Sequence, residues 1–362
     1  MASSPPSSWY TSETALRAET DRVFRTSWQL LGHTSRLERE GDYFTGQLFP
    51  AAPFLACKDQ QGHIRAFHNV CRHHAAAVAA GSGNTDCFSC PYHGWTYGLD
   101  GRLLKAVGLK GIQMFKAAES GLAPLQVARV GPWIFGVVGS GRDADVLPQL
   151  ETCLGPEGLR ALMGSGACRE QMVHVASRVY PIGCNWKVFC DNYLDGGYHV
   201  AVAHPDLAAS LDLASYTSNV YETLSIQSCQ PRSEGERLAG GLDAAYAFIF
   251  PNIMINSYGP WIDTNVVLPT GPESCKVIFD YYLEHSRAQD KDFVAASLAA
   301  SDQVQQEDIG LCESVQRGLA SPAYDVGRYV PRFEGAMHHF HRLLNGSIDK
   351  VMTPAIDGMV LM

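Results

Sequence analysis

Two short clusters of cysteine and histidine constrain this sequence more than any other feature. The first cluster, CRH, contributes Cys71 and His73, and the second cluster, CPYH, contributes Cys90 and His93. Sixteen residues separate His73 from Cys90. Each cluster thus offers one sulfur and one nitrogen atom. A chain that brings the two clusters together needs two adjacent loops held by a rigid framework, with a metal group between them.

The mixed pairing predicts which group that is. Zinc fingers commonly group two cysteines apart from two histidines. One cysteine and one histidine from each loop instead favour a Rieske [2Fe-2S] centre, in which two thiolates hold one iron and two imidazoles hold the other. Zinc remains the alternative. Cys87 forms a C-x2-C pair with Cys90, which by itself could be a redox pair, but such a pair leaves His93 without a role. His74 adjoins His73; the C-x-H spacing selects His73, and we interpret His74 as a surface or packing residue.

The pattern of predicted secondary structure along the chain indicates two kinds of domain. Residues 42–138 consist of short β-type runs, with hairpin turns expected at Gly62 and at Asp100-Gly101. The segments on either side alternate between helical and strand patterns. We therefore expect an α+β fold in which an all-β domain, residues 42–140, is inserted into a larger α+β domain formed by residues 1–41 and 141–362.

Several segments predict individual elements. Residues 11–31 place Leu16, Val23, Phe24 and Leu30 at helical spacing and predict one amphipathic helix. The runs MVHVASRVYPI and CKVIFDYYLEH predict strands, and the long run from KDFVAASL to SVQRGL predicts one or two helices.

Composition excludes several function classes. The formal net charge of -9 disfavours nucleic acid as a partner, because phosphate binding requires a basic surface. No run of 18 apolar residues lacks charges, and the N-terminus lacks the pattern of a secretory signal, so we expect a soluble intracellular protein with no membrane contact. The 11 cysteines are scattered, which indicates thiols and a metal site rather than a disulfide framework.

A second candidate metal site lies in the segment NWKVFCDNYLDGGYHVAVAHPDL. Its histidines, His199 and His204, are five residues apart and would lie about 140° apart on a regular helix. The pair Gly196-Gly197 before them and Pro205 after them predict a broken helix end, at which both rings converge. Two histidines alone are more commonly core or surface residues, so a third ligand is needed.

A carboxylate on a later helix is the candidate third ligand. Val304, Asp308, Leu311 and Val315 share one helical face, which predicts an apolar, inward-facing stripe that includes Asp308. An unpaired carboxylate is costly in such a place, and iron would offset that cost. The set matches a 2-His-1-carboxylate facial triad with positions open for oxygen. Glu307, a third of a turn away, is the reserve candidate.

Together these segments resemble a known family. The PYHGW motif, the DNYLDGGYHVAVAH segment and the QQEDIGLCESVQRGL helix resemble the alpha subunits of Rieske non-haem iron oxygenases over nearly the whole chain. More narrowly, SSWY, DYFTG, AFHNVC, CFSCPYHGWTYGLDG, YGPWIDTN, FDYYLE, SPAYDVGRY and GAMHHFH are similar to the choline monooxygenase family. The resemblance implies that the α+β domain has a helix-grip (START-like) fold.

The resemblance also implies roles for individual residues. It places the [2Fe-2S] cluster on the four residues of the two Cys-His clusters, and a mononuclear iron on His199, His204 and Asp308. It implies a homotrimer, in which an acid three residues before the first iron histidine bridges one subunit's cluster and the next subunit's iron. That position is Gly196 here. Asp195 is the first candidate for the bridging role and Asp191 the second, and Asn192 belongs to the same catalytic segment.

The implied activity is oxidation of choline to betaine aldehyde, with O2 and with electrons from reduced ferredoxin or a ferredoxin-like reductase. The implied compartment is the cytoplasm, or the chloroplast stroma for a trimmed mature form. Alternatives are another quaternary amine (carnitine, or demethylation of glycine betaine), an aromatic ring, or a pure electron-transfer Rieske protein, which would need no second iron.

We also interpret three further groups of residues, which concern substrate binding, ferredoxin docking and a late cluster of histidines. A quaternary ammonium needs aromatic faces and a carboxylate, and we expect Trp261, Tyr281 and Phe250 to form a cation–π cage. A basic stretch after the second Cys-His cluster is a candidate docking site for an acidic ferredoxin. The histidines of AMHHFHRLL are interpreted as helix-surface or packing residues. The basic stretch contains Arg102, Lys105, Lys110 and Lys116, and the histidines are His338, His339 and His341.

Overall fold

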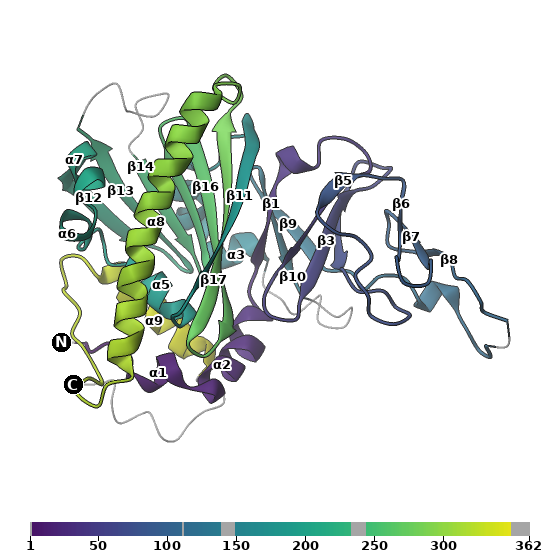
Figure 1. The fold of residues 1–362 in the computed structure, drawn as a ribbon, viewed down its shortest axis with the longest axis horizontal. Helices are drawn as coiled ribbons and strands as arrows, with labels where there is room; N and C mark the ends of the chain where they lie inside the picture. The colour runs from purple at the N-terminus through teal and green to yellow at the C-terminus, as the bar shows by residue number, and fades with distance from the viewer. Residues whose placement is uncertain (1, 111, 139–148, 233–243, 349–362) are drawn as a thin grey trace. The chain divides into compact units, whose positions relative to one another are not determined.

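The computed structural model describes residues 2–110, 112–138, 149–232 and 244–348, and these divide into two compact units (Figure 1). One unit spans Trp28–Pro148, and the other combines Met1–Ser27 with Gln149–Met362. The sequence of one unit is thus inserted into that of the other, as expected. The divisions follow residues 27 and 148, whereas the sequence placed them after 41 and 140. Residues 140 and 141 lie outside the described part of the chain.

The described residues of the unit Trp28–Pro148 form antiparallel sheets with the orders β1-β10-β9, β4-β3-β2-β5 and β6-β7-β8. Strand β1 pairs with β10, which explains why the unit begins well before residue 42. Two 3-10 turns, η2 (Thr34–Arg36) and η3 (Ala117–Glu119), complete it. The strands are β1 (Gln29–His33), β2 (Asp42–Gln47), β3 (Pro53–Lys58), β4 (Ile64–His68), β5 (Ser82–Asn84), β6 (Cys87–Ser89), β7 (Thr96–Gly98), β8 (Leu103–Lys105), β9 (Gln126–Val130) and β10 (Trp133–Val137).

The second unit is built on a seven-stranded antiparallel sheet with the order β11-β17-β16-β15-β14-β13-β12. Strands β12 to β17 follow one another as a meander, and β11 pairs with β17 at the far edge. Burial alternates along much of β17, as expected for a strand with two different faces. The strands are β11 (Met172–Ile182), β12 (Leu211–Val220), β13 (Leu224–Pro231), β14 (Ala244–Ile249), β15 (Ile253–Tyr258), β16 (Trp261–Gly271) and β17 (Ser274–Glu284).

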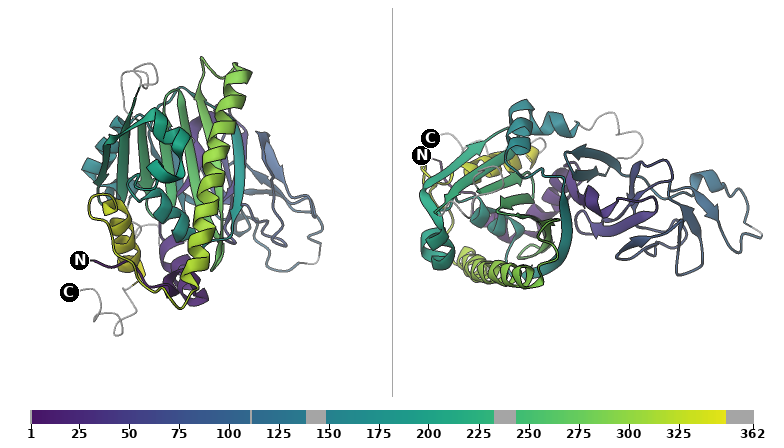
Figure 2. Two further views of the ribbon diagram at one scale, coloured as in Figure 1. Left: turned by 60° about the vertical axis from the view of Figure 1, so that its left-hand side comes forward. Right: turned by 90° about the horizontal axis from the view of Figure 1, so that it is seen from above.

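One long helix, α8 (Lys291–Leu319), crosses a face of this sheet (Figures 1 and 2). It contacts β11 and the shorter helix α5 (Trp186–Tyr193), and α5 in turn contacts β16 and β17. A long helix gripped against an antiparallel sheet is the helix-grip arrangement that was expected. The remaining helices are α1 (Ser8–Thr11), α2 (Glu13–Glu19), the π-helix η1 (Thr20–Phe24), α3 (Leu150–Leu154), α4 (Pro156–Gly164), α6 (Val200–Ala203), α7 (Pro205–Ser210) and α9 (Gly335–Ile348).

Sequence patterns predicted the later elements better than the first one. MVHVASRVYPI is strand β11, CKVIFDYYLEH lies almost wholly within β17, and the long helical run is the single helix α8. The prediction of one helix over residues 11–31 is wrong. The segment divides into the end of α1, then α2 and η1, and its last residues enter β1, so that Leu30 pairs with Phe135 across a sheet. None of the described helices is long and apolar enough to cross a membrane.

A buried ion pair fixes the N-terminal helices to α5. Glu19, the last residue of α2, accepts hydrogen bonds from Lys187 Nζ and from Trp186 Nε1, each at 2.7 Å. Both charged side chains are almost completely buried. Burial lowers the pKa of Lys187, and Glu19 opposes that shift. Because one charge would be left buried alone, loss of either partner is costly.

We expect Glu19→Gln to lower the free energy of unfolding by about 3–5 kcal/mol, because the ammonium group of Lys187 loses its counter-charge in a buried place. Thermal and chemical unfolding measure this loss. The matched control is Glu13→Gln, which removes the exposed pair of Glu13 with Arg17 on the same helix and should change stability by no more than about 0.5 kcal/mol. Equal effects of the two substitutions would contradict a stabilising role for the buried pair.

Candidate metal centres and substrate cavity

The two Cys-His loops of the β-rich unit have the same backbone hydrogen-bond pattern. Cys71 N donates to Ala76 O and Ala75 N donates to Cys71 O, at 2.8 and 3.0 Å. The second loop repeats this pattern, since Cys90 N donates to Trp95 O and Gly94 N donates to Cys90 O, at 2.8 and 2.9 Å. Ala75 and Gly94 also share a positive φ, 60° and 71°. The two loops therefore present their cysteines in equivalent positions.

Both sulfurs lie in the core of this unit. Cys71 and Cys90 belong to a buried cluster with Phe67, Phe88 and other apolar residues. Burial acts to raise the pKa of the Cys71 thiol, but hydrogen bonds from Tyr97, from backbone N–H groups and from Cys90 outweigh it, and the net shift is downward. Tyr97 Oη lies 3.2 Å from Cys71 Sγ. A site that favours the thiolate is suited to hold a metal, because the thiolate is the ligand form of cysteine.

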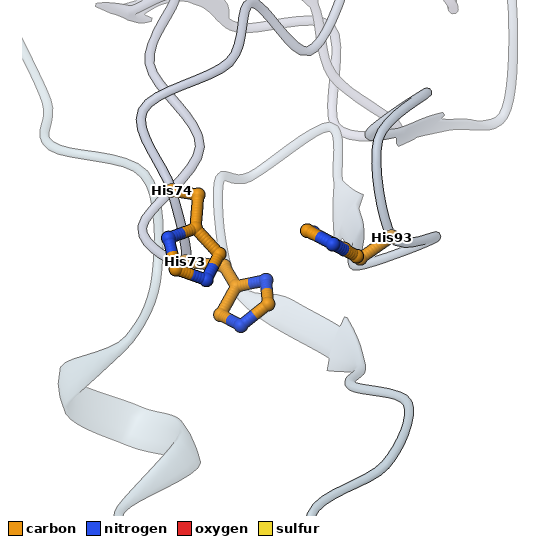
Figure 3. Close-up of side chains that lie close together, drawn as sticks. All are labelled: His73, His74 and His93. Atoms are coloured by element: carbon orange, nitrogen blue, oxygen red, sulfur yellow. The ribbon is translucent and has the colours of Figure 1, made fainter.

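The imidazoles of the two loops are exposed and lie close together. His73 and His74 come from one loop and His93 from the other, and their ring nitrogens form a group within 4.8 Å (Figure 3). The ring of His73 also stacks on the buried Trp95, with the ring centroids 4.8 Å apart. Two buried sulfurs and neighbouring exposed imidazoles fit a two-iron cluster at the unit's surface. The geometry does not by itself exclude His74, whereas Cys87 lies outside the buried cluster, on β6.

His199, His204 and Asp308 form the second group of candidate ligands. His199 precedes α6 and His204 lies between α6 and α7, so the chain is broken there, as expected. Gly196 and Gly197 both have φ of 73°, in the left-handed region that favours glycine. A Cβ on Gly196 would collide with the carbonyl oxygen of Phe333. Only glycine therefore allows the turn that delivers both histidines.

The Nε2 atoms of both histidines converge on Asp308. Oδ1 of Asp308 lies 3.0 Å from His204 Nε2 and 3.6 Å from His199 Nε2, and it accepts a hydrogen bond from Asn192 at 2.8 Å. The hydrogen bond to Asp308, assisted by Glu307, raises the pKa of His204 to about 9. Asn192, on α5, is thus a direct partner of the candidate carboxylate ligand.

The Nδ1 atoms are held by two other carboxylates. Glu307 Oε2 lies 2.6 Å from His204 Nδ1, and Asp195 Oδ2 lies 2.6 Å from His199 Nδ1. Each imidazole is therefore fixed on one nitrogen by a carboxylate and has its other nitrogen directed to the common point. Metal-binding histidines show this arrangement, in which the outer partner sets the tautomer and ring orientation. From the sequence, Glu307 was expected only as the alternative to Asp308 for the third ligand.

Asp195 and Asp191 have different surroundings. Asp195 contacts the candidate iron ligand His199, as described above. Asp191 instead accepts a hydrogen bond from Tyr10 at 2.8 Å and lies 2.9 Å from His341 Nε2. His341, on α9, is buried and also lies 2.7 Å from Tyr329 Oη. The three late histidines contribute none of the described candidate ligand groups.

The inward face of α8 differs from the predicted one. Leu311 and Val315, which were expected to face inward with Asp308, are 39% and 51% exposed. The buried positions are Gln305, Cys312, Gln316 and Leu319, and Asp308 lies at the edge of that stripe. Asp308 therefore faces the site, but it does so without the apolar stripe that was predicted around it. The helix packs mainly through polar and sulfur-containing side chains, and a search for apolar residues at helical spacing does not find them.

A cavity of about 990 Å³ adjoins the second group, between the sheet and α8. Its lining includes His199, His204 and Asp308, together with Trp261 and Tyr281. Two of the three expected cage residues thus face one cavity. Phe250 is absent from the described lining and packs against Phe340, so the structure does not bring it to the cage. Further aromatic lining comes from Phe189, Tyr193, Tyr216, Tyr246, Tyr258, Phe279 and Phe293.

Sequence reasoning missed a buried acid in this cavity. Asp263, on β16, is only 3% exposed and lines the cavity. It follows Trp261 by two residues, so both side chains lie on the same face of the strand. The segment YGPWIDTN resembles a motif of the family, but nothing in its pattern indicates that the carboxylate is buried.

The basic stretch is partly neutralised by neighbours. Arg102 pairs with Asp100 and Lys116 pairs with Glu119, at 2.5 and 2.7 Å. Lys105 is exposed, as is Lys110, and neither forms an ion pair with another described residue. These two lysines are the charges still available on the stretch.

Two family models match the chain, one over each of the segments that contain the candidate metal groups. Residues 27–116 match the Rieske [2Fe-2S] domain, and residues 169–349 match the catalytic domain of the ring hydroxylating alpha subunit. The chain is 48% identical over 355 residues to the chloroplastic choline monooxygenase of Arabidopsis thaliana, covering 96% of this chain and 83% of that protein. The enzyme of the same name from Amaranthus tricolor is 42% identical, covering 95% and 78%.

A solved structure is also similar to the chain over nearly its whole length. A quaternary ammonium Rieske monooxygenase, whose structure concerns carnitine oxidation by gut microbiota and inter-subunit electron transfer, has a TM-score of 0.84 to this chain and 26% identity. The match covers 96% of this chain and 95% of that one.

We expect Gly196→Ala to reduce the mononuclear iron bound per chain, because the added Cβ displaces the turn that positions His199. The positive φ alone costs about 1–2 kcal/mol for an L-residue. Iron content after removal of loosely bound metal measures the effect. Gly318→Ala on α8 is the control, because a Cβ at that position meets no atom within 4 Å. Unchanged iron content in Gly196→Ala would contradict the role assigned to the turn.

Proposed function

Because the chain belongs to the Rieske oxygenases with a ring-hydroxylating alpha-subunit catalytic domain, we propose that it oxidises choline to betaine aldehyde, with O2 and with electrons from a reduced ferredoxin. The chain is an oxidoreductase of the monooxygenase type, and the two cofactors of its family fit its two groups of side chains. The convergence of His199, His204 and Asp308 beside an aromatic-lined cavity is the observation that carries the proposal. A pure electron-transfer protein would need no such group.

We assign Cys71 and Cys90 to one iron of the [2Fe-2S] cluster and His73 and His93 to the other. The lowered pKa of Cys71 supports the first assignment, and the exposed, adjacent rings support the second. The bound cluster supplies single electrons at a potential raised by its neutral imidazole ligands. The chain's own contribution is to bury the sulfurs and to leave the imidazoles at the surface.

For the mononuclear iron we assign His199, His204 and Asp308 as ligands. Such a facial triad leaves coordination positions open and, when iron is bound, supplies chemistry with O2. Glu307 and Asp195 hold the Nδ1 atoms and direct the Nε2 atoms inward. Asn192 holds Oδ1 of Asp308 through its side-chain amide. These three neighbours keep the ligands oriented, which is the protein's task in a cofactor-dependent reaction.

The overall reaction has a simple balance. Choline, O2, two electrons and two protons give the hydrate of betaine aldehyde and one water, and the hydrate then loses a second water. The carbinol carbon of choline must therefore lie toward the triad. We propose that Trp261 and Tyr281 contact the trimethylammonium group through cation–π interactions. The lining of the cavity by both rings supports this role.

The same family membership supports a proposal for the partners and the compartment. We propose a homotrimer with electron transfer between subunits, and Asp195 as the acid between the cluster of one subunit and the iron of the next. Its contact with His199 supports Asp195 over Asp191, which is engaged with Tyr10 and His341. Lys105 and Lys110 are the charges proposed to meet an acidic ferredoxin. The chloroplastic relatives favour the chloroplast stroma as the compartment.

The cluster assignment predicts a contrast between adjacent residues. His73→Ala should abolish the visible absorption and the electron paramagnetic resonance spectrum of the Rieske centre, because one iron loses a ligand. His74→Ala should retain both, since its ring is a neighbour and not a ligand. The same contrast is expected between Cys90→Ser and Cys87→Ser. Loss of the spectrum in His74→Ala, with retention in His73→Ala, would reverse the assignment.

The choline assignment predicts product in a single turnover. Protein with both iron centres is reduced without oxygen and then mixed with choline and O2, and betaine aldehyde is assayed. We expect product in proportion to the mononuclear iron. Asp308→Ala, which keeps the Cys-His loops unchanged, should retain the reduced cluster and form no product. Absence of product from the fully loaded parent protein would refute choline as substrate, and product from carnitine or glycine betaine would identify another quaternary amine.

A further inference from the structure

Asp263 is the one acid of the described cavity lining whose hydrogen-bond partners, among the described residues, are all uncharged. Oδ1 accepts hydrogen bonds from Asn256 and Asn265, both at 2.8 Å, and Oδ2 accepts one from Tyr258 at 2.7 Å. No described lysine, arginine or histidine forms an ion pair with it. Burial raises the pKa of Asp263, and these three donors oppose that shift.

The other acids of this lining are each engaged with a cationic or imidazole group. Glu284 pairs with Arg169 at 2.7 Å. Asp195 and Asp308 contact the two histidines of the triad. A buried carboxylate without a cation is costly, because hydrogen bonds replace only part of its hydration. Asp263 therefore has an unmatched charge in a cavity that is built to receive a ligand.

Aromatic rings surround the same place. Register pairs Asp263 with Tyr281 on the neighbouring strand β17, and Trp261 lies two residues away on the same strand. Trp261 meets Tyr281 edge-on, with ring centroids 6.4 Å apart, and stacks with Phe293 of α8 at 6.1 Å. The charge of Asp263 is also one of the influences that, after burial, raise the pKa of Tyr281. The carboxylate and the rings thus share one region of the cavity.

The occupied oxygen atoms of Asp263 indicate the chemistry of the missing partner. Three neutral donors already bond to the carboxylate, so a ligand need not offer N–H groups. A quaternary ammonium has no such groups, and it interacts through its charge and its methyl surface, which suits a carboxylate behind aromatic faces. A primary ammonium would instead lose hydrogen bonds to water that this region replaces poorly.

We propose that Asp263 is the counter-ion of a quaternary ammonium subsite and is the residue that makes the cavity select a cation over a neutral molecule of the same shape. This inference rests on the proposed function, since it places the onium end of that substrate. It adds to the rings a fixed negative charge, held in position by Asn256, Asn265 and Tyr258.

The test compares binding of choline with binding of 3,3-dimethylbutan-1-ol, in which carbon replaces the charged nitrogen. Equilibrium binding is measured by calorimetry on the iron-loaded protein without a reductant, so that no turnover is required. We expect the parent protein to favour choline, and Asp263→Asn to reduce the ratio of the two affinities by about 10–100-fold, mainly by weakening choline binding. Tetramethylammonium should follow choline.

Asp280→Asn is the matched control. Asp280 lies on β17 beside Asp263's strand but outside the described cavity lining, and it also accepts hydrogen bonds, from Ser177 and at 3.1 Å with His174. Its substitution should leave the affinity ratio unchanged. Iron content and thermal melting show whether each variant is folded. For a poorly folded Asp263→Asn protein, Tyr258→Phe, which removes one of the donors, should still alter the ratio.

The outcomes separate this inference from the proposed function. Equal binding of choline and its neutral analogue by the parent protein, or an unchanged ratio in folded Asp263→Asn, would overturn the subsite even where choline is turned over. A ratio that falls in Asp263→Asn supports the subsite even where choline gives no product, because tetramethylammonium reports the onium site without chemistry. In that case another quaternary amine occupies it.

Discussion

The active site depends on two carboxylates, each of which holds one imidazole by its Nδ1 atom. Asp195 and Glu307 each lie 2.6 Å from the Nδ1 atom of one histidine, and this leaves the two Nε2 atoms to converge with Asp308. Without a bound cation, three carboxylates around two imidazoles form an unbalanced group of charges in a partly buried site. A divalent metal held by these residues would offset that imbalance, and the outer carboxylates would then fix the ring orientation and strengthen the ligands. The broken chain around α6 positions the two histidines, and helix α8 positions Asp308 and Glu307.

Much of this organisation could be predicted, because it follows from local sequence. The C-x-H and C-x2-H spacing identifies two loops that prove to be equivalent in their hydrogen bonding. The Gly196-Gly197 pair predicts a break in the chain, and with both glycines at positive φ, histidines that a regular helix would separate can converge. The long helix α8 and the two paired strands β11 and β17 could likewise be predicted, because their periodicity extends over many residues.

What could not be predicted depends on partners distant in sequence. Leu30 belongs to a strand because β10 lies beside it, although its spacing fits a helix. Leu311 and Val315 suggest an apolar face, yet α8 packs through Gln305, Gln316 and other positions instead. Phe250 is as aromatic as Trp261 but packs outside the cavity. In each case the residue type was informative, and the tertiary partner determined where the side chain lies.

The cavity has acidic side chains in two places, one at the metal group and one on the sheet. Helix α8 supplies Asp308 and Glu307 to the metal group, whereas the sheet supplies Asp263. Asp308 lies against the imidazoles of His199 and His204, whereas the described partners of Asp263 are all neutral. A substrate that is cationic at one end and carries the reacting carbon at the other satisfies both places at once. Tyr193, which follows Asn192 on α5, bonds to Asn256 at 2.7 Å, and Asn256 bonds to Asp263. One short helix thus supports the reacting end and the recognition end together, which keeps their separation fixed.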